Sequence, residues 1–169
     1  MGGVNTTPHA KSPSESEVIM TQIVLPSHTN ALGSIFGGTV MSWIDIAAAI
    51  AAGRHSRKVV VTASVDALHF IAPIKLGQIV HVRAKVNFAS KTSMEVGVRV
   101  DSENPLTGEM HHNVSAYTTF VALDQNGKPT PVPGVSPQSP DEKRRFKEAQ
   151  KRRAARIALA EEIKATRSE

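Results

Sequence analysis

The sequence predicts an α+β domain in which one antiparallel sheet curls around a single long central helix. Three observations favour this fold. A strongly apolar segment, roughly residues 38–54, has the length and composition of a helix that other elements cover. Strand-like runs with alternating apolar and polar residues follow it. The "ASKT" connection between two of these runs is short enough for a hairpin, which makes an antiparallel sheet the expected arrangement.

The predicted elements follow one another over 169 residues, a length that suits one domain with tails. The small and polar residues 1–16 are expected to form a disordered arm. The folded domain is expected over residues 17–125. A proline-rich linker at 126–140 then leads into a basic C-terminal helix at 141–169. The strands of the domain are expected to begin near Val18, Lys58, Ile79, Ser93 and Asn113.

Two of the strand-like runs alternate so regularly that each is expected to have one buried face. The apolar positions of the first run are Val80, Val82, Ala84, Val86 and Phe88, and its polar positions are His81, Arg83, Lys85 and Asn87. In the second run the apolar positions are Met94, Val96, Val98 and Val100, and the polar positions are Glu95, Arg99 and Asp101.

The net charge of +5 belongs mainly to the C-terminal tail. Residues 141–169 contain ten Lys or Arg and six Asp or Glu, a net of +4, which leaves +1 for the first 140 residues. The charge therefore does not indicate that the core binds nucleic acid. Phe146 is alone among the basic residues of the tail, whereas a surface for single strands needs interleaved aromatic residues. We expect the tail to pack on the domain, and the alternatives are contact with another subunit, with nucleic acid or with anionic lipid.

The absence of cysteine excludes disulfides, thiolate zinc sites and a cysteine nucleophile, and it favours a reducing, cytoplasmic location. The polar N-terminus contains no apolar segment typical of a signal peptide. The apolar central segment falls short of the ~20 residues that span a membrane, and it carries Asp45 near its middle. A buried helix in a soluble protein is therefore the favoured interpretation.

Asp45 is the exception in the central helix. Of the fifteen positions between Gly38 and Arg54, the other fourteen are apolar or small. A carboxylate is costly to bury unless it is paired or solvated. Asp45 could therefore border a cavity as a functional group, or it could be a structural acid that a backbone group or the Ser42 hydroxyl satisfies. The residues alone leave both interpretations open.

Gly37 and Gly38 lie where the central helix is expected to begin. The unpaired N–H groups of a helix start, together with the positive end of its dipole, can polarise a carbonyl group. A pair of glycines suits a tight turn equally well. Asn30, in the preceding loop, could donate its amide to a carbonyl oxygen or position a water, and it could also simply form a turn.

An ordered set of motifs carries a resemblance to a known family. The motifs are "SHTNALGSIFGGTVMSWID", then "VDALHFIAPIKLGQIV", then "SKTSMEV". Over roughly residues 18–123 the chain resembles the acyl-CoA hydrolase family of hotdog-fold thioesterases. The resemblance implies hydrolysis of fatty acyl-CoA to free acid and CoA, without a cofactor beyond the CoA of the substrate. It also implies an aspartate on the central helix and an asparagine in the preceding loop, positions that Asp45 and Asn30 occupy here.

In such an enzyme Asp45 would act as general base on water, or as a nucleophile that forms a mixed anhydride. Gly38 and Asp45 are seven residues apart, which separates them by ~10 Å along a helix. They are too far apart to act on one carbonyl carbon, so we expect a site between two chains. The resemblance implies the same, and it further implies a hexamer built as a trimer of dimers.

Binding of CoA requires groups that contact phosphates. Lys91 lies where similar proteins often have arginine, and with Ser90 and Thr92 it could bind a phosphate. Arg54, Arg57 and Lys58 are further candidates, and for every one of these residues an exposed surface role is an equal alternative. His28 departs from the acidic residue that relatives commonly carry, which leaves its role open.

His69 is expected to be structural or to line the binding pocket. His111 and His112 are adjacent on a strand and therefore point to opposite faces, with no evident carboxylate partner, so no metal site is predicted. The alternative to an enzyme is a non-catalytic module of the same fold that binds acyl-CoA or has a regulatory role.

Overall fold

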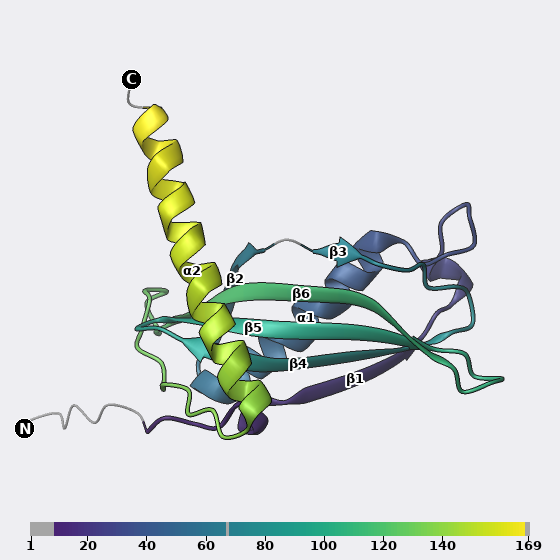
Figure 1. Ribbon diagram of the computed structural model, residues 1–169, viewed down its shortest axis with the longest axis horizontal. Helices are drawn as coiled ribbons and strands as arrows, with labels where there is room; N and C mark the ends of the chain where they lie inside the picture. The colour runs from purple at the N-terminus through teal and green to yellow at the C-terminus, as the bar shows by residue number, and fades with distance from the viewer. Residues whose placement is uncertain (1–8, 67, 168–169) are drawn as a thin grey trace, which may run out of the picture.

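The structure, a computed structural model, describes residues 9–66 and 68–167. Helix α1 (Gly37–Ser56) packs on one face of a six-stranded antiparallel sheet, and helix α2 (Pro140–Thr166) crosses the opposite face (Figure 1). The strand order is β1-β4-β5-β6-β2, and β3 pairs with β6. These elements confirm the expected antiparallel sheet around a central helix. The strands are β1 (Val18–Ile23), β2 (Val59–Val65), β3 (His69–Phe70), β4 (Ile79–Ala89), β5 (Ser93–Glu103) and β6 (Met110–Leu123).

The sheet covers only one side of α1. Ala47, Ala48, Ala51 and Ala52 are fully buried, because these short side chains let the strands approach the helix closely. The opposite side of the helix is open. Met41, Ile46 and Ile50 there are 48%, 47% and 42% exposed. The composition of the helix had suggested that other elements cover it on every side. Within one chain they do not.

The predicted inner positions are correct along β5 and along most of β4. The expectation of a single buried face was wrong for β5, because Glu95 and Asp101 on its polar face are also buried. Val80, Val82 and Val86 are fully buried on the face that contacts α1. The pairing of β4 with β5 shifts between Val86 and Phe88, as in a β-bulge. The shift turns Phe88 to the outer face, where its ring contacts that of Phe146 edge-on at 5.2 Å. The prediction that Phe88 shares the inner face was therefore wrong, because period-two counting fails at a bulge.

Residues 9–16 belong to the fold, which corrects the expected disordered arm over that stretch. A short 3-10 helix, η1 (Pro13–Ser16), places the buried Ser16 hydroxyl where it accepts a hydrogen bond from the Val86 N–H at 2.9 Å. The Lys11 ammonium donates to the carbonyl of His55 at the end of α1. Residues 1–8 of the expected arm lie outside the described residues.

The segment expected as a linker also packs against the domain. Val132 is buried, and the buried His55 ring donates from Nε2 to the Pro133 carbonyl at 2.8 Å. A second short 3-10 helix, η2 (Pro26–His28), lies in the loop before α1. Among the residues that the structure describes, no helix combines the length and apolar character that crossing a bilayer requires.

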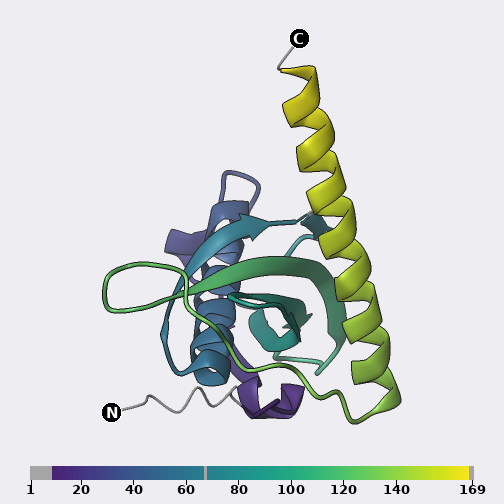
Figure 2. The same ribbon diagram turned by 90° about the vertical axis from the view of Figure 1, so that its left-hand side faces the viewer.

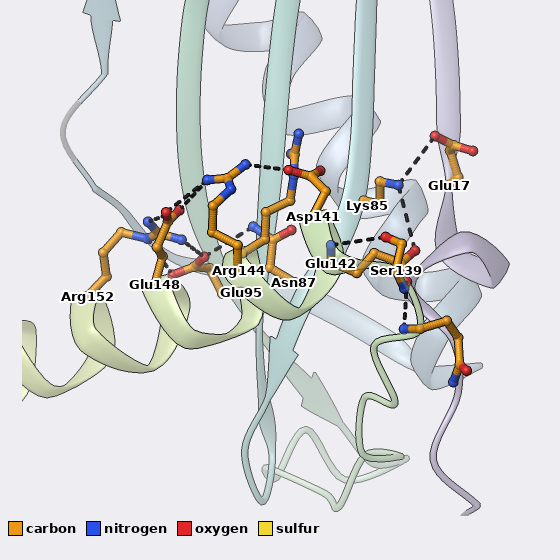
Figure 3. Close-up of polar contacts among 12 residues, drawn as sticks. Glu17, Lys85, Asn87, Glu95, Ser139, Asp141, Glu142, Arg144, Glu148 and Arg152 are labelled. Atoms are coloured by element: carbon orange, nitrogen blue, oxygen red, sulfur yellow. Dashed lines mark hydrogen bonds and ion pairs between the residues drawn. The ribbon is translucent and has the colours of Figure 1, made fainter.

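The first half of α2 is anchored to the outer face of the sheet (Figures 2 and 3). Arg152 donates to both carboxylate oxygens of Glu95, at 2.8 and 3.1 Å, and Glu95 is only 3% exposed. The same guanidinium lies 3.6 Å over the ring of Tyr117. Burial alone would lower the pKa of Arg152, but the pairing with Glu95 outweighs it and raises that pKa. The expected packing of the tail therefore applies to this half of the helix.

The C-terminal part of α2 extends beyond the sheet into solvent (Figures 1 and 2). Its apolar residues Ile157, Leu159 and Ile163 are 40%, 56% and 43% exposed.

Replacing Arg152 with leucine is expected to destabilise the fold by about 3 kcal/mol, because it leaves the buried Glu95 carboxylate without its partner. Denaturant unfolding of the variant measures the loss. The matched change Arg144→Leu removes two exposed ion pairs within the same helix, with Asp141 and Glu148, and is expected to cost only a small fraction of that amount. Equal losses in the two variants would contradict the anchoring role of Arg152.

Candidate active site

Asp45 lies in the middle of α1 on its uncovered side. Its side chain accepts a hydrogen bond at Oδ1 from the Thr62 hydroxyl of β2, at 2.7 Å. Among the described residues no other hydrogen bond to this carboxylate is present, so Oδ2 is free to accept a proton. The neighbouring exposed side chains Met41 and Ile46 are apolar. The alternative in which Ser42 or a backbone group satisfies a buried Asp45 does not describe this structure, because the acid is exposed and its partner is Thr62.

The sequence analysis did not identify Thr62. The only signal was a hydroxyl side chain in the apolar run "VVVTASV", which is weak because threonine is common in strands. β2 is an edge strand with β6 as its neighbour, and its pairing shifts between Thr62 and Ser64. A β-bulge therefore follows Thr62 directly, and bulges change the direction of side chains near functional sites.

The two glycines at the start of α1 let two phenyl rings lie close to the helix backbone. A Cβ on Gly37 would lie 3.3 Å from the ring of Phe70, and one on Gly38 would lie 2.4 Å from the ring of Phe36. The first hydrogen bonds of the helix run from the N–H groups of Thr39 and Val40 to the Phe36 carbonyl. In the described part of the chain the N–H groups of both glycines are without a partner, which leaves them available to an oxygen atom at the positive end of the helix dipole.

An open cavity of about 300 Å³ adjoins this helix start. Its wall is largely apolar. The residues that line it include Ser34, Gly37, Phe70, Ile71 and Ile74.

Asn30 forms the turn that its sequence position allowed, and its NH₂ group stays unpaired within the described structure. Its Oδ1 accepts hydrogen bonds from the N–H groups of Leu32 and Ser34, at 2.9 and 3.4 Å, and so holds the turn before α1. Its NH₂ group has no partner among the described residues and remains available as a donor. His28, in the same loop, accepts from the Leu25 N–H and packs edge-on against Trp43 at 5.3 Å, which is a structural role.

The residues expected to contact CoA gather at the other end of α1. Ser90, Lys91 and Thr92 form the turn between β4 and β5, and Arg54 and Arg57 lie in and after the last turn of the helix. The carbonyl of Lys91 accepts from Val132, which joins this turn to the segment that follows β6.

Two of the basic residues at this end have structural contacts. Arg54 donates to the Glu17 carbonyl, and Lys58 donates to the Pro131 carbonyl at 2.7 Å. Arg57 closes the helix with a left-handed backbone (φ 54°). Because α1 has 20 residues, about 30 Å of helix separates this group from Gly37. One chain therefore does not bring the two groups together.

His112 has a carboxylate partner that the sequence analysis did not anticipate. Its Nδ1 lies 3.0 Å from Asp101 and its Nε2 lies 3.0 Å from the Ser115 hydroxyl. His111 lies 3.3 Å from Glu109 instead. In the described ranges, no three histidine or acidic side chains converge as a metal site would require. His69 is exposed on β3.

Comparisons with known proteins agree with this architecture. The family model of the thioesterase superfamily matches residues 32–109. The uncharacterized acyl-CoA thioester hydrolase YkhA of Bacillus subtilis is 43% identical over 136 residues, which cover 80% of this chain and 79% of that protein.

Solved structures are similar over nearly the whole chain. An apo-hexameric acyl-CoA thioesterase is 42% identical with a TM-score of 0.88, covering 90% of this chain and 97% of the other. An acyl-CoA hydrolase of Staphylococcus aureus, solved with butyryl-CoA, CoA and CoA disulfide, is 41% identical with a TM-score of 0.87, covering 93% and 96%. Variants of the latter with one aspartate, one threonine or one asparagine replaced by alanine match with TM-scores of 0.87, 0.86 and 0.84. The chain belongs to the acyl-CoA thioester hydrolase family of hotdog-fold thioesterases.

Proposed function

We propose that the protein hydrolyses acyl-CoA thioesters to free fatty acid and CoA, with Asp45 as the general base. The observation that carries this proposal is the Asp45 carboxylate, which a single hydrogen bond from Thr62 holds on an open, apolar helix face. That bond fixes one carboxylate oxygen and leaves the other to accept a proton. A general base needs this arrangement, because it must be both oriented and free to accept.

The chemistry follows from the groups around the helix start. Asp45 takes a proton from a water, whose oxygen attacks the thioester carbonyl carbon. The negative charge that develops on the carbonyl oxygen is stabilised by the free N–H groups of Gly37 and Gly38 and by the NH₂ group of Asn30. The carbon–sulfur bond then breaks, and the departing CoA sulfur takes the proton back from Asp45. We prefer this route to a mixed anhydride because the Thr62 bond orients the acid as a proton acceptor.

The site is proposed to form between two chains. Gly38 and Asp45 are separated by ~10 Å along α1, so the glycines and Asn30 of one chain would act with Asp45 of a second. An open apolar surface supports the pairing. It comprises the free edge of β2, with Val59 70% and Val61 43% exposed, and the uncovered side of α1. The hexameric relative supports a further assembly as a trimer of dimers.

The Staphylococcus aureus variants lend support to the assignment of residues. The asparagine, aspartate and threonine replaced in that enzyme are spaced 15 and 17 residues apart, as are Asn30, Asp45 and Thr62. The same three polar residue types therefore occur at the same spacing at the positions that we propose for catalysis.

We assign CoA binding to Ser90, Lys91, Thr92, Arg54 and Arg57, with the Lys91 ammonium directed at a phosphate because it is exposed and has no partner among the described residues. The apolar cavity beside Gly37 would take the acyl chain or the pantetheine arm. The reaction needs no cofactor, and the cysteine-free sequence fits a cytoplasmic enzyme.

Replacing Asp45 with asparagine is expected to lower kcat about 1,000-fold, because the amide cannot accept the proton of water. The measurement is CoA release from butyryl-CoA with a thiol-detecting reagent. Calorimetry should show that the variant still binds the substrate. Glu161→Gln, which removes a negative charge on the projecting half of α2, serves as the control and should keep full activity. An Asp45→Asn variant with wild-type turnover would refute the mechanism.

Mixing two inactive variants tests whether the site is shared between chains. Asn30→Ala and Asp45→Ala subunits, unfolded together and refolded in equal amounts, are expected to regain about a quarter of wild-type activity, because mixed dimers contain one intact site. Each variant refolded alone gives the baseline. A mixture no more active than its components would show that both residues act within one chain.

A further inference from the structure

An ion pair connects α2 to the strand that carries Thr62. Arg156 donates from one guanidinium nitrogen to both oxygens of Asp66, at 3.0 and 2.8 Å. Asp66 directly follows β2, and its backbone N–H donates to the Tyr117 carbonyl of β6 at 2.9 Å. Both charged side chains are partly shielded, with 31% and 20% exposed. The C-terminal helix thus contacts the end of the strand that positions Asp45.

Thr62 is in a part of the sheet that is otherwise weakly constrained. β2 has β6 as its only neighbour among the described strands, so one side of its backbone is free. The register shift between Thr62 and Ser64 interrupts the pairing immediately beyond Thr62. The direction of the Thr62 hydroxyl therefore depends on how the bulge is held. Beyond the bulge only Ser64 and Val65 still pair with β6 within β2, and Asp66 adds the contact of this strand end to α2.

α2 is held against the sheet just before Arg156. One turn before Arg156, Arg152 is bound to the buried Glu95 and stacked on Tyr117. Ala149 is fully buried against the sheet, and Phe146 packs on Phe88. Arg156 follows one turn later, where it forms its ion pair with Asp66 at the end of β2.

We propose that Arg156 is a positioning residue for thioester hydrolysis. Through Asp66 it holds the end of β2 and the bulge, and so it keeps the Thr62 hydroxyl directed at the Asp45 carboxylate. The inference rests on the proposed function, since it assumes that Asp45 is the base. Partly exposed ion pairs contribute little to stability, so the effect of this pair is expected in the rate of hydrolysis rather than in unfolding.

The first test removes the charge on either side of the pair. Arg156→Gln and Asp66→Asn are each expected to lower kcat about tenfold while KM stays within about twofold, because a misplaced base slows chemistry more than it weakens binding. The control is Arg153→Gln, a loss of the same charge on the same helix at a residue without an ion pair in the described structure. It should leave kcat unchanged. The exchanged pair Asp66→Arg/Arg156→Asp should recover most of the lost rate, which a merely structural role of either side chain would not predict.

The second test asks whether Arg156 acts through Thr62. Thr62→Val removes the hydroxyl, and in that background Arg156→Gln is expected to change kcat by less than about twofold, because the two residues belong to one chain of contacts. A full tenfold loss in the Thr62→Val background would overturn the proposal, and so would an Arg156→Gln variant with wild-type kcat. If Asp45→Asn also keeps full activity, the proposed function fails as well. If the Arg156 variants keep full activity but Asp45→Asn does not, the proposed function is retained and only the inference about Arg156 is wrong.

Discussion

The incomplete cover of α1 is the constraint on which the rest of the structure depends. The sheet packs against the alanine-rich side of the helix and leaves Met41, Asp45 and Ile46 on the other side exposed. Exposure of an apolar helix face beside a free strand edge is unfavourable in water, and such a surface favours binding of a second chain. In the proposed dimer, the contact that buries the apolar side chains is the one that brings a carbonyl-binding helix start to Asp45. Assembly and catalysis would therefore have the same physical origin.

The two faces of the sheet are built on different principles. The inner face is apolar, whereas the outer face carries carboxylates that need partners. Burial would raise the pKa of Asp101, but hydrogen bonds from Arg99 and His112 outweigh it and hold that pKa below its usual range. Glu95 has no equivalent partner within the sheet except the distant amide of Asn87, at 3.4 Å, and it depends on Arg152 of α2. The first half of α2 is thus part of the domain, because without it a buried charge would be unpaired.

Sequence reasoning succeeded where local patterns decide the structure. The central helix was predicted at about 38–54 and spans Gly37–Ser56, and the alternation in β5 placed all four of its inner residues correctly. It failed where the outcome depends on contacts between distant residues. No sequence period or composition predicts the bulge that turns Phe88 outward. The same is true of the packing of residues 9–16 against β4. Asp45 was conspicuous as a charge among apolar residues, but its partner Thr62 is an ordinary residue of a strand.

The candidate site therefore depends on contacts between residues that are separated by very different distances along the sequence. Thr62 lies 17 residues from Asp45, and Arg156 lies 90 residues from Asp66. The core around α1 is close-packed and resists displacement, whereas β2 is an edge strand interrupted by a bulge. A side chain on such a strand can shift by a fraction of an ångström without any loss of core packing, and general-base catalysis is sensitive to shifts of that size. In the proposed scheme, a change at Arg156 consequently alters the rate of hydrolysis with little change in stability, whereas a change at Arg152 destabilises the fold.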